Sequence, residues 1–128
     1  MTKQRVASVT AAIGAGVLFA TAGFHLSGYS SVVSQTATDL RPLMAAVWVA
    51  VGASLIISAL LAIAATPLFT VRRRALLAIA ALTPISIAAV QIGYLGFLLP
   101  TAILLLDAAL LLAAGELGRP YQPRPAAV

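Results

Sequence analysis

Residues 42–65, PLMAAVWVAVGASLIISALLAIAA, contain no charged side chain and decide the fold class. A helix of about 20 consecutive apolar residues crosses the hydrocarbon core of a bilayer, and this stretch is long enough to do so. Asp39 is expected to cap the N-terminus of the helix, and Pro42 suits its first turn. Thr66 and Pro67 are expected to end it. The stretch therefore predicts a transmembrane helix.

Three further apolar stretches lie on either side of it, at about 6–25, 75–94 and 100–117. A polar segment at 26–40, LSGYSSVVSQTATDL, is expected to be a loop with a short interfacial turn around Val32 and Val33. The pattern predicts an all-α integral membrane protein, an antiparallel bundle of four transmembrane helices spanning residues 1–117. The proline-rich segment 118–128 is expected to be a disordered cytoplasmic tail.

Composition points the same way and excludes several kinds of chemistry. Of the 128 residues, 62% are hydrophobic and 9% are charged, whereas soluble domains are about 25% charged. The chain has no cysteine, one histidine and three acidic residues. Disulfides and thiolate chemistry are therefore excluded, and too few ligands remain for a zinc or two-metal site. A haem held by two histidines is also excluded, and no cofactor is expected.

The first apolar stretch admits a second interpretation. Lys3 and Arg5 resemble the charged start of a signal peptide, and Ala20-Thr21-Ala22 resembles a cleavage site. The apolar run is longer than the usual 7–15 residues of such a peptide. We therefore expect a span that is retained.

The basic residues predict the topology. Seven of the eight lie before the first span, between the second and third, or after the fourth, namely Lys3, Arg5, Arg72, Arg73, Arg74, Arg119 and Arg124. Only Arg41 lies in the other loops. The positive-inside rule then places both termini in the cytoplasm, in a multi-pass protein of a bacterial-type inner membrane. Because these clusters sit between spans, they indicate membrane lipid as the partner and no nucleic acid.

Two residues at the cytoplasmic ends receive specific expectations. Glu116 is expected to be a solvated end charge beside Arg119. The three consecutive arginines at 72–74 are expected to fix orientation and to contact anionic lipid heads.

Small residues recur at every fourth position of the first two spans, where they let helices approach closely. They are Ala12, Gly16 and Ala20 in the first span, and Ala46, Ala50, Ser54, Ser58 and Ala62 in the second. We expect them to form the packed core of the bundle. A homo-oligomeric contact or a larger membrane complex is the alternative use of the same surfaces.

The polar residues of the spans gather in the predicted outer half of the membrane. At about 1.5 Å per residue, Trp48 lies roughly 9 Å below the outer end of its span and Asp107 about 10 Å. His25, Gln91 and Tyr94 lie at or near outer ends. The inner half is almost wholly apolar. A polar pocket is therefore expected to open toward the outer half, with Trp48, Gln91 and Tyr94 as ligand-binding residues.

Asp107 is the least expected of these residues. A carboxylate at the centre of a membrane helix costs about 2.5–3.5 kcal/mol even on lenient scales. One interpretation is a proton-exchanging carboxyl or an anchor for a ligand, with His25 as a second catalytic acid or base. The other is a structural hydrogen bond from Asp107 to Gln91, Trp48 or His25.

Three functions from different classes remain open, and the sequence does not decide whether the protein is an enzyme. The first is a bundle that binds or acts on a hydrophobic small molecule, a lipid, quinone or isoprenoid, by acid/base chemistry at Asp107 and His25. The second is an accessory subunit of a membrane complex. The third is a proton-coupled exporter that works as an oligomer.

The exporter hypothesis follows a resemblance in architecture. In length and span number the chain resembles the small multidrug resistance family, which are dimeric four-span exporters with an essential membrane glutamate. That family's acid lies in its first span, where this chain has none, and the acid here lies in the fourth. The resemblance therefore implies an architecture and carries over no functional residue.

Overall fold

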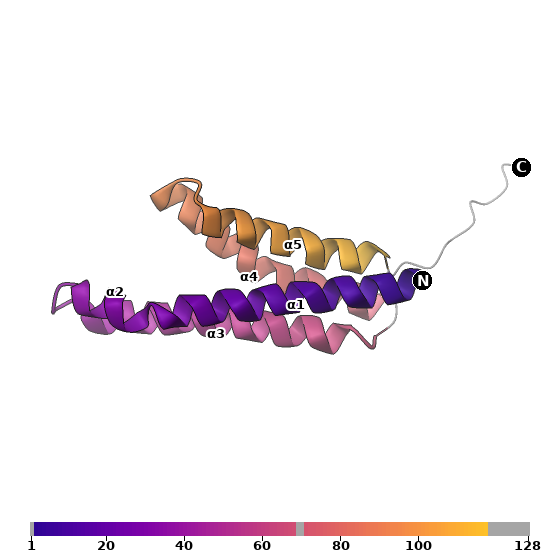
Figure 1. The fold of residues 1–128 in the computed structure, drawn as a ribbon, viewed down its shortest axis with the longest axis horizontal. Helices are drawn as coiled ribbons and strands as arrows, with labels where there is room; N and C mark the ends of the chain where they lie inside the picture. The colour runs from indigo at the N-terminus through magenta and orange to yellow at the C-terminus, as the bar shows by residue number, and fades with distance from the viewer. Residues whose placement is uncertain (1, 69–70, 118–128) are drawn as a thin grey trace, which may run out of the picture.

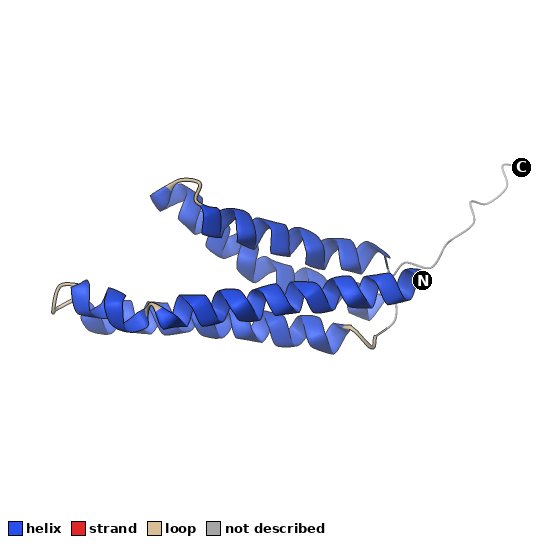
Figure 2. Cartoon of the chain, in the orientation of Figure 1, coloured by secondary structure: helices blue, strands red, loops and turns tan. Residues whose placement is uncertain are grey.

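A computed structural model describes residues 2–68 and 71–117. In this part of the chain the secondary structure is entirely helical (Figure 2). The helices are α1 (Lys3–Ser27), α2 (Tyr29–Gln35), α3 (Arg41–Ala65), α4 (Val71–Leu95) and α5 (Leu99–Leu117). Four of them, α1, α3, α4 and α5, are long and apolar enough to cross a membrane. The predicted all-helical class with four such helices is confirmed, and the expected tail at 118–128 lies outside the described residues.

The four long helices run up and down, and each packs against two neighbours. Helix α1 packs on α3 and α5, and α4 packs on the other sides of α3 and α5. Figure 1 shows the α1/α3 pair and the α4/α5 pair close together at the end that carries the N-terminus and diverging toward the other end. We call these the basic end, which holds Lys3, Arg5 and Arg72–Arg74, and the open end, which holds α2 and the turn between α4 and α5.

Helix α1 meets α3 at close range because glycine stands at the contact. A Cβ added to Gly52 of α3 would lie 2.6 Å from Cδ2 of Leu26, closer than real Cβ atoms approach. The backbone of α3 therefore packs directly on the Leu26 side chain. This close approach brings the end of α1 and the start of α3 together at the open end.

The core is built from small residues, but the predicted faces are only partly correct. In α1 the buried residues are Ala7, Ala11, Gly14, Ala15, Leu18 and Ala22, whereas the predicted core residues Ala12, Gly16 and Ala20 are exposed. In α3, Ser58 and Ala62 are buried, and Ala46, Ala50 and Ser54 are exposed. Small residues occur on several faces of these helices. Spacing alone therefore does not say which face meets another helix.

The segment expected to be a loop at 26–40 is also more ordered than predicted. Helix α1 continues to Ser27, and α2 follows at once. Asp39 does not cap α3: the N-cap is Leu40, without a side-chain hydrogen bond. Pro42 lies in the first turn of α3, as predicted. Arg41 donates from Nε to the Thr36 carbonyl at 3.0 Å and from Nη2 to the Ser34 carbonyl at 3.1 Å.

Arg73 holds three helices together at the basic end. Its side chain is 1% exposed. Nε donates to the Ala65 carbonyl at 3.3 Å, and Nη2 donates to the Ser8 hydroxyl at 2.8 Å and to the Thr66 carbonyl. These carbonyls lie at the C-terminus of α3, where the helix leaves acceptors unpaired. The expectation that all three arginines face lipid heads is therefore wrong for Arg73.

Glu116 forms an ion pair with Arg74 at the basic end. Its Oε1 lies 2.8 Å from Nε of Arg74, and both side chains are about half exposed. The first turn of α4 thus places Arg74 beside the end of α5. Arg119, the predicted neighbour of Glu116, lies outside the described residues.

Candidate functional site

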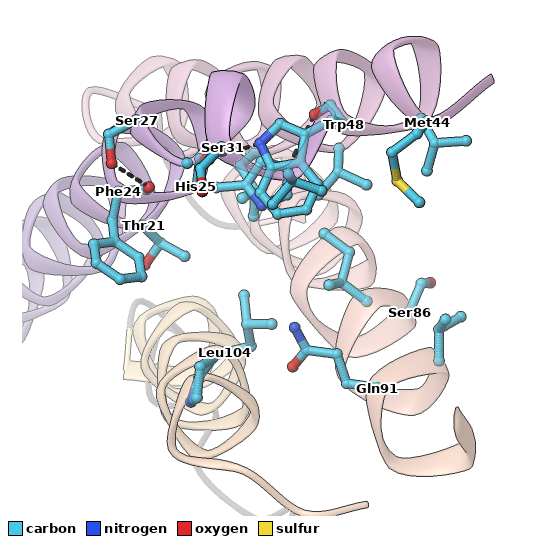
Figure 3. A pocket seen from close by; sticks show the side chains of 18 residues that line it. Thr21, Phe24, His25, Ser27, Ser31, Met44, Trp48, Ser86, Gln91 and Leu104 are labelled. Carbon is cyan, nitrogen blue, oxygen red and sulfur yellow. Dashed lines mark hydrogen bonds between the residues drawn. The ribbon is translucent and has the colours of Figure 1, made fainter. Parts of the chain in front are cut away.

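A cavity of about 770 Å³ lies between the two helix pairs at the open end. Its walls come from α1 and α2 on one side, α3 on a second, and α4 and α5 opposite (Figure 3). Most lining side chains are apolar, including Phe24, Met44, Val90 and Leu104. His25, Trp48 and Gln91 supply the large polar side chains. The cavity lies at the end where the two helix pairs diverge in Figure 1.

His25 and Trp48 lock α1 and α3 together on the wall of this cavity. The two rings stack with centroids 4.2 Å apart and planes 13° from parallel. Trp48 Nε1 donates to the His25 carbonyl at 2.7 Å, and His25 Nε2 lies 2.9 Å from the Trp48 carbonyl. A carbonyl only accepts, so Nε2 of His25 carries the proton. Within the part of the chain that the structure describes, Nδ1 has no protein partner.

The sequence places this pair where it can form. His25 lies in the last turn of α1 and Trp48 in the second turn of α3, so an antiparallel packing brings them level. Gly28 follows α1 and leaves room for the indole: a Cβ there would lie 3.4 Å from Cζ2 of Trp48. Tryptophan is expected near the membrane interface. Here the indole N–H donates to the His25 carbonyl, and the ring lines the cavity.

Gln91 extends from α4 into the cavity, where Figure 3 shows its amide between the helices. Its Oε1 accepts a hydrogen bond from the Thr101 hydroxyl at 2.9 Å. That hydroxyl accepts in turn from the Leu98 backbone N–H at 3.4 Å. In this arrangement Thr101 gives its proton to Oε1, which leaves Nε2 of Gln91 without a hydrogen-bond partner in the described part of the chain. Gln91 Nε2, with two N–H donors, faces the cavity.

Thr101 was not among the predicted site residues, although the sequence contained a signal for it. The turn of the α4/α5 hairpin centres on Gly96, which has a positive φ of 79°. Gln91 stands five residues before this glycine and Thr101 five after it. Residues at equal distances from the turn of an antiparallel pair lie side by side. Their pairing follows from the position of the turn.

Asp107 lies outside the cavity. Its side chain is 1% exposed, and neither carboxyl oxygen has a hydrogen-bond partner among the described residues. It faces α1 at Gly14, where an added Cβ would lie 3.4 Å from Oδ1 of Asp107. Leu104, one turn earlier on α5, lines the cavity. Asp107 is therefore about 4.5 Å further along the helix, one layer below.

The structural hydrogen bond expected for Asp107 is absent from the described part of the molecule. His25 and Trp48 bond to each other, and Gln91 bonds to Thr101. The rotation of α5 explains this outcome. Residues three or four apart share a face, so Asp107 shares its face with Leu104 and Leu111 and points to the closed α1/α5 contact.

Tyr94, the fifth predicted site residue, is 86% exposed and does not line the cavity. It occupies the last turn of α4, beyond Gln91. The structure thus brings together His25, Trp48 and Gln91, and it places Asp107 beneath them and Tyr94 outside. No group of three potential metal ligands occurs among residues 2–68 and 71–117.

Comparison with known proteins finds no matching family model, no similar curated protein and no similar solved structure.

Proposed function

We propose that the protein is a four-span membrane protein whose cavity binds an uncharged hydrophobic small molecule from the outer half of the bilayer. The observation that carries the proposal is the cavity itself: about 770 Å³, within the range of small-molecule sites, between helices that pack tightly elsewhere. Its lining is apolar with a few convergent polar groups. This combination is typical of a ligand site.

The distribution of charge supports the orientation in the membrane. Among the described residues, Lys3, Arg5 and Arg72–Arg74 lie at the basic end, and Arg41 is the one basic residue at the open end. By the positive-inside rule, the basic end faces the cytoplasm. The cavity then opens toward the outer leaflet of a bacterial-type inner membrane.

The chemistry available to a bound molecule is proton transfer. His25 is the titratable side chain on the described wall of the cavity, and its Nε2 is held by Trp48, so Nδ1 is the nitrogen that can exchange a proton. Asp107 lies one layer beneath, and the cost of burying a carboxyl is not repaid there by a hydrogen bond. We therefore assign Asp107 a proton-exchanging role beneath the cavity, out of direct contact with the bound molecule.

Trp48 makes the proposal measurable, because it is the chain's single tryptophan and it lines the cavity. In detergent, 1-bromododecane is expected to quench Trp48 fluorescence in a saturable manner. Val90→Phe, which enlarges a lining side chain, is expected to weaken that quenching at least several-fold. Ile92→Phe makes a comparable change on the same helix outside the lining and is expected to leave it unchanged.

Quenching that rises linearly with bromododecane, with no saturation and no difference between the two variants, would refute the proposed site.

A further inference from the structure

The charge of the cavity wall restricts what it can bind. None of the lining residues is a lysine, arginine, aspartate or glutamate within the described part of the chain. Arg41, the basic residue at this end, donates to the carbonyls of Thr36 and Ser34 at the C-terminus of α2. A phosphate or carboxylate head group placed in the cavity would lose its hydration without gaining a counter-charge, which is costly. The ligand is therefore uncharged.

Several polar atoms of the wall are already hydrogen-bonded, whereas Nδ1 of His25 can only accept and has no partner among the described residues. The Trp48 N–H and the His25 Nε2–H bond to backbone carbonyls. Ser27 donates to the Phe24 carbonyl at 2.7 Å, and Ser31 accepts from Gln35 at 3.1 Å. The hydroxyls of Thr21 and Ser86 also line the cavity. A hydroxyl can donate or accept, so these two do not select between a donor and an acceptor on the ligand.

Gln91 is different, because its unused atom can only donate. Thr101 donates to Oε1, and the Nε2 end of the amide, which carries two N–H groups, points into the cavity (Figure 3). No other lining side chain among the described residues presents a free group of this kind. A ligand that offers no acceptor leaves these donors unpaired in an apolar site, and that lowers its affinity.

We infer that Gln91 selects an apolar ligand carrying an uncharged acceptor oxygen, the carbonyl of a ketone, quinone or ester, and holds it through Nε2–H. This inference rests on the proposed function and specifies the ligand of the same cavity. The apolar walls accept the hydrocarbon part, and Gln91 fixes the carbonyl opposite the His25–Trp48 pair. Thr101 acts as a positioning residue, because it turns the amide nitrogen toward the ligand.

Competition against bromododecane quenching of Trp48 tests this assignment with three competitors of equal chain length. On the wild-type protein, 2-dodecanone is expected to displace the quencher about tenfold more tightly than dodecane, the ratio that one well-made hydrogen bond supplies. Dodecyl phosphate is expected to compete more weakly than 2-dodecanone. Gln91→Leu is expected to remove the preference for the ketone while retaining dodecane binding.

Gln4→Leu is the matched control, because Gln4 is an exposed glutamine at the basic end. It is expected to keep the tenfold preference. If bromododecane quenching is saturable but the ketone and the hydrocarbon compete equally, or Gln91→Leu keeps the preference, the inference about Gln91 is wrong and the cavity remains a binding site. If quenching is not saturable at all, the proposed function is wrong as well.

The stability of the variant and its affinity for bromododecane show whether Gln91 has a purely structural effect. The Gln91→Leu protein is expected to keep the thermal midpoint of the wild type to within a few degrees and to be quenched by bromododecane with the same midpoint. Weaker quenching by bromododecane in this variant would show that Gln91 shapes the cavity and does not bind the carbonyl of the ligand.

Discussion

Asp107 and Gly14 face each other at the contact between α5 and α1, and both residues have a clear physical consequence. The glycine makes room for the α5 side chains, since a Cβ at position 14 would lie 2.8 Å from Cδ2 of Leu111. The carboxyl beside it is buried without a partner among the described residues. Burying a carboxyl without a hydrogen bond destabilises the folded protein, so Asp107 is a candidate for function.

Gly14→Ala is expected to destabilise the protein by about 1–3 kcal/mol, because overpacking forces a well-packed core to shift. Gly16→Ala is the control: it lies half a turn away, and a Cβ there meets no atom within 4 Å. It is expected to leave stability unchanged or to raise it by up to about 1 kcal/mol, because alanine favours a helix more than glycine does. Thermal unfolding in detergent checks both. Equal midpoints for the two variants would show that α1 does not meet α5 at Gly14.

Asp107→Asn is expected to leave the thermal midpoint nearly unchanged, because the described contacts of the carboxyl include no hydrogen bond to lose. In the wild type, dicyclohexylcarbodiimide, an apolar carboxyl reagent, is expected to form an adduct on Asp107, and bromododecane in the cavity is expected to slow it. The asparagine variant is expected to form none there. Mass spectrometry of peptides measures the adduct. A drop in midpoint of ten degrees would instead indicate a structural hydrogen bond.

At the scale of the helices, the end of α3 depends on a side chain from the next helix. Helix C-termini leave carbonyls without intrahelical partners. The Arg73 guanidinium donates to the carbonyls of Ala65 and Thr66 and also to the Ser8 hydroxyl. Three helices are thereby joined at the basic end. The tight closure there contrasts with the divergence of the helix pairs at the open end.

Arg73→Met is expected to destabilise the protein by about 2–3 kcal/mol, since charge-assisted hydrogen bonds to buried carbonyls are lost. Arg72→Met removes the same charge from an exposed neighbour and is expected to have an effect below about 0.5 kcal/mol. Thermal unfolding of the two variants side by side measures the difference. Equal losses would mean that Arg73 acts through its charge alone.

The existence of the helices could be predicted from sequence, but not the faces they bury. An apolar run of about 20 residues predicts a span by its length. Which side meets another helix is not encoded in the same way, because lipid and protein interior are both apolar. The spacing of small residues therefore predicts core positions for Ala12 and Gly16, which lie on the exposed side of α1. The depth of each residue in its span predicts that His25, Trp48 and Gln91 lie together. It does not predict that Asp107 faces α1 and lies below the cavity.

For the whole molecule, the orientation in the membrane decides which leaflet the cavity faces. The helix pairs close at the basic end and separate at the open end. If the basic end faces the cytoplasm, molecules of the outer leaflet have access to the cavity and molecules of the inner leaflet do not. The orientation is therefore part of the proposed function.

Single cysteines test this orientation without background, because the chain contains none of its own. Thr38→Cys, between α2 and α3, is expected to react with a membrane-impermeant maleimide in intact spheroplasts. Gln4→Cys, at the basic end, is expected to react only after the membrane is opened. Both positions are exposed. The reverse pattern would place the cavity in the inner half of the membrane.

The content of the cavity in protein purified from its own membrane tests the central claim most directly. Organic extraction and mass spectrometry are expected to recover from the wild type and from Ile92→Phe a phosphate-free apolar molecule bearing a carbonyl, at close to one per chain. Val90→Phe is expected to carry much less of it. Recovery of the same bulk phospholipids from all three proteins, with no enriched apolar molecule, would contradict the account.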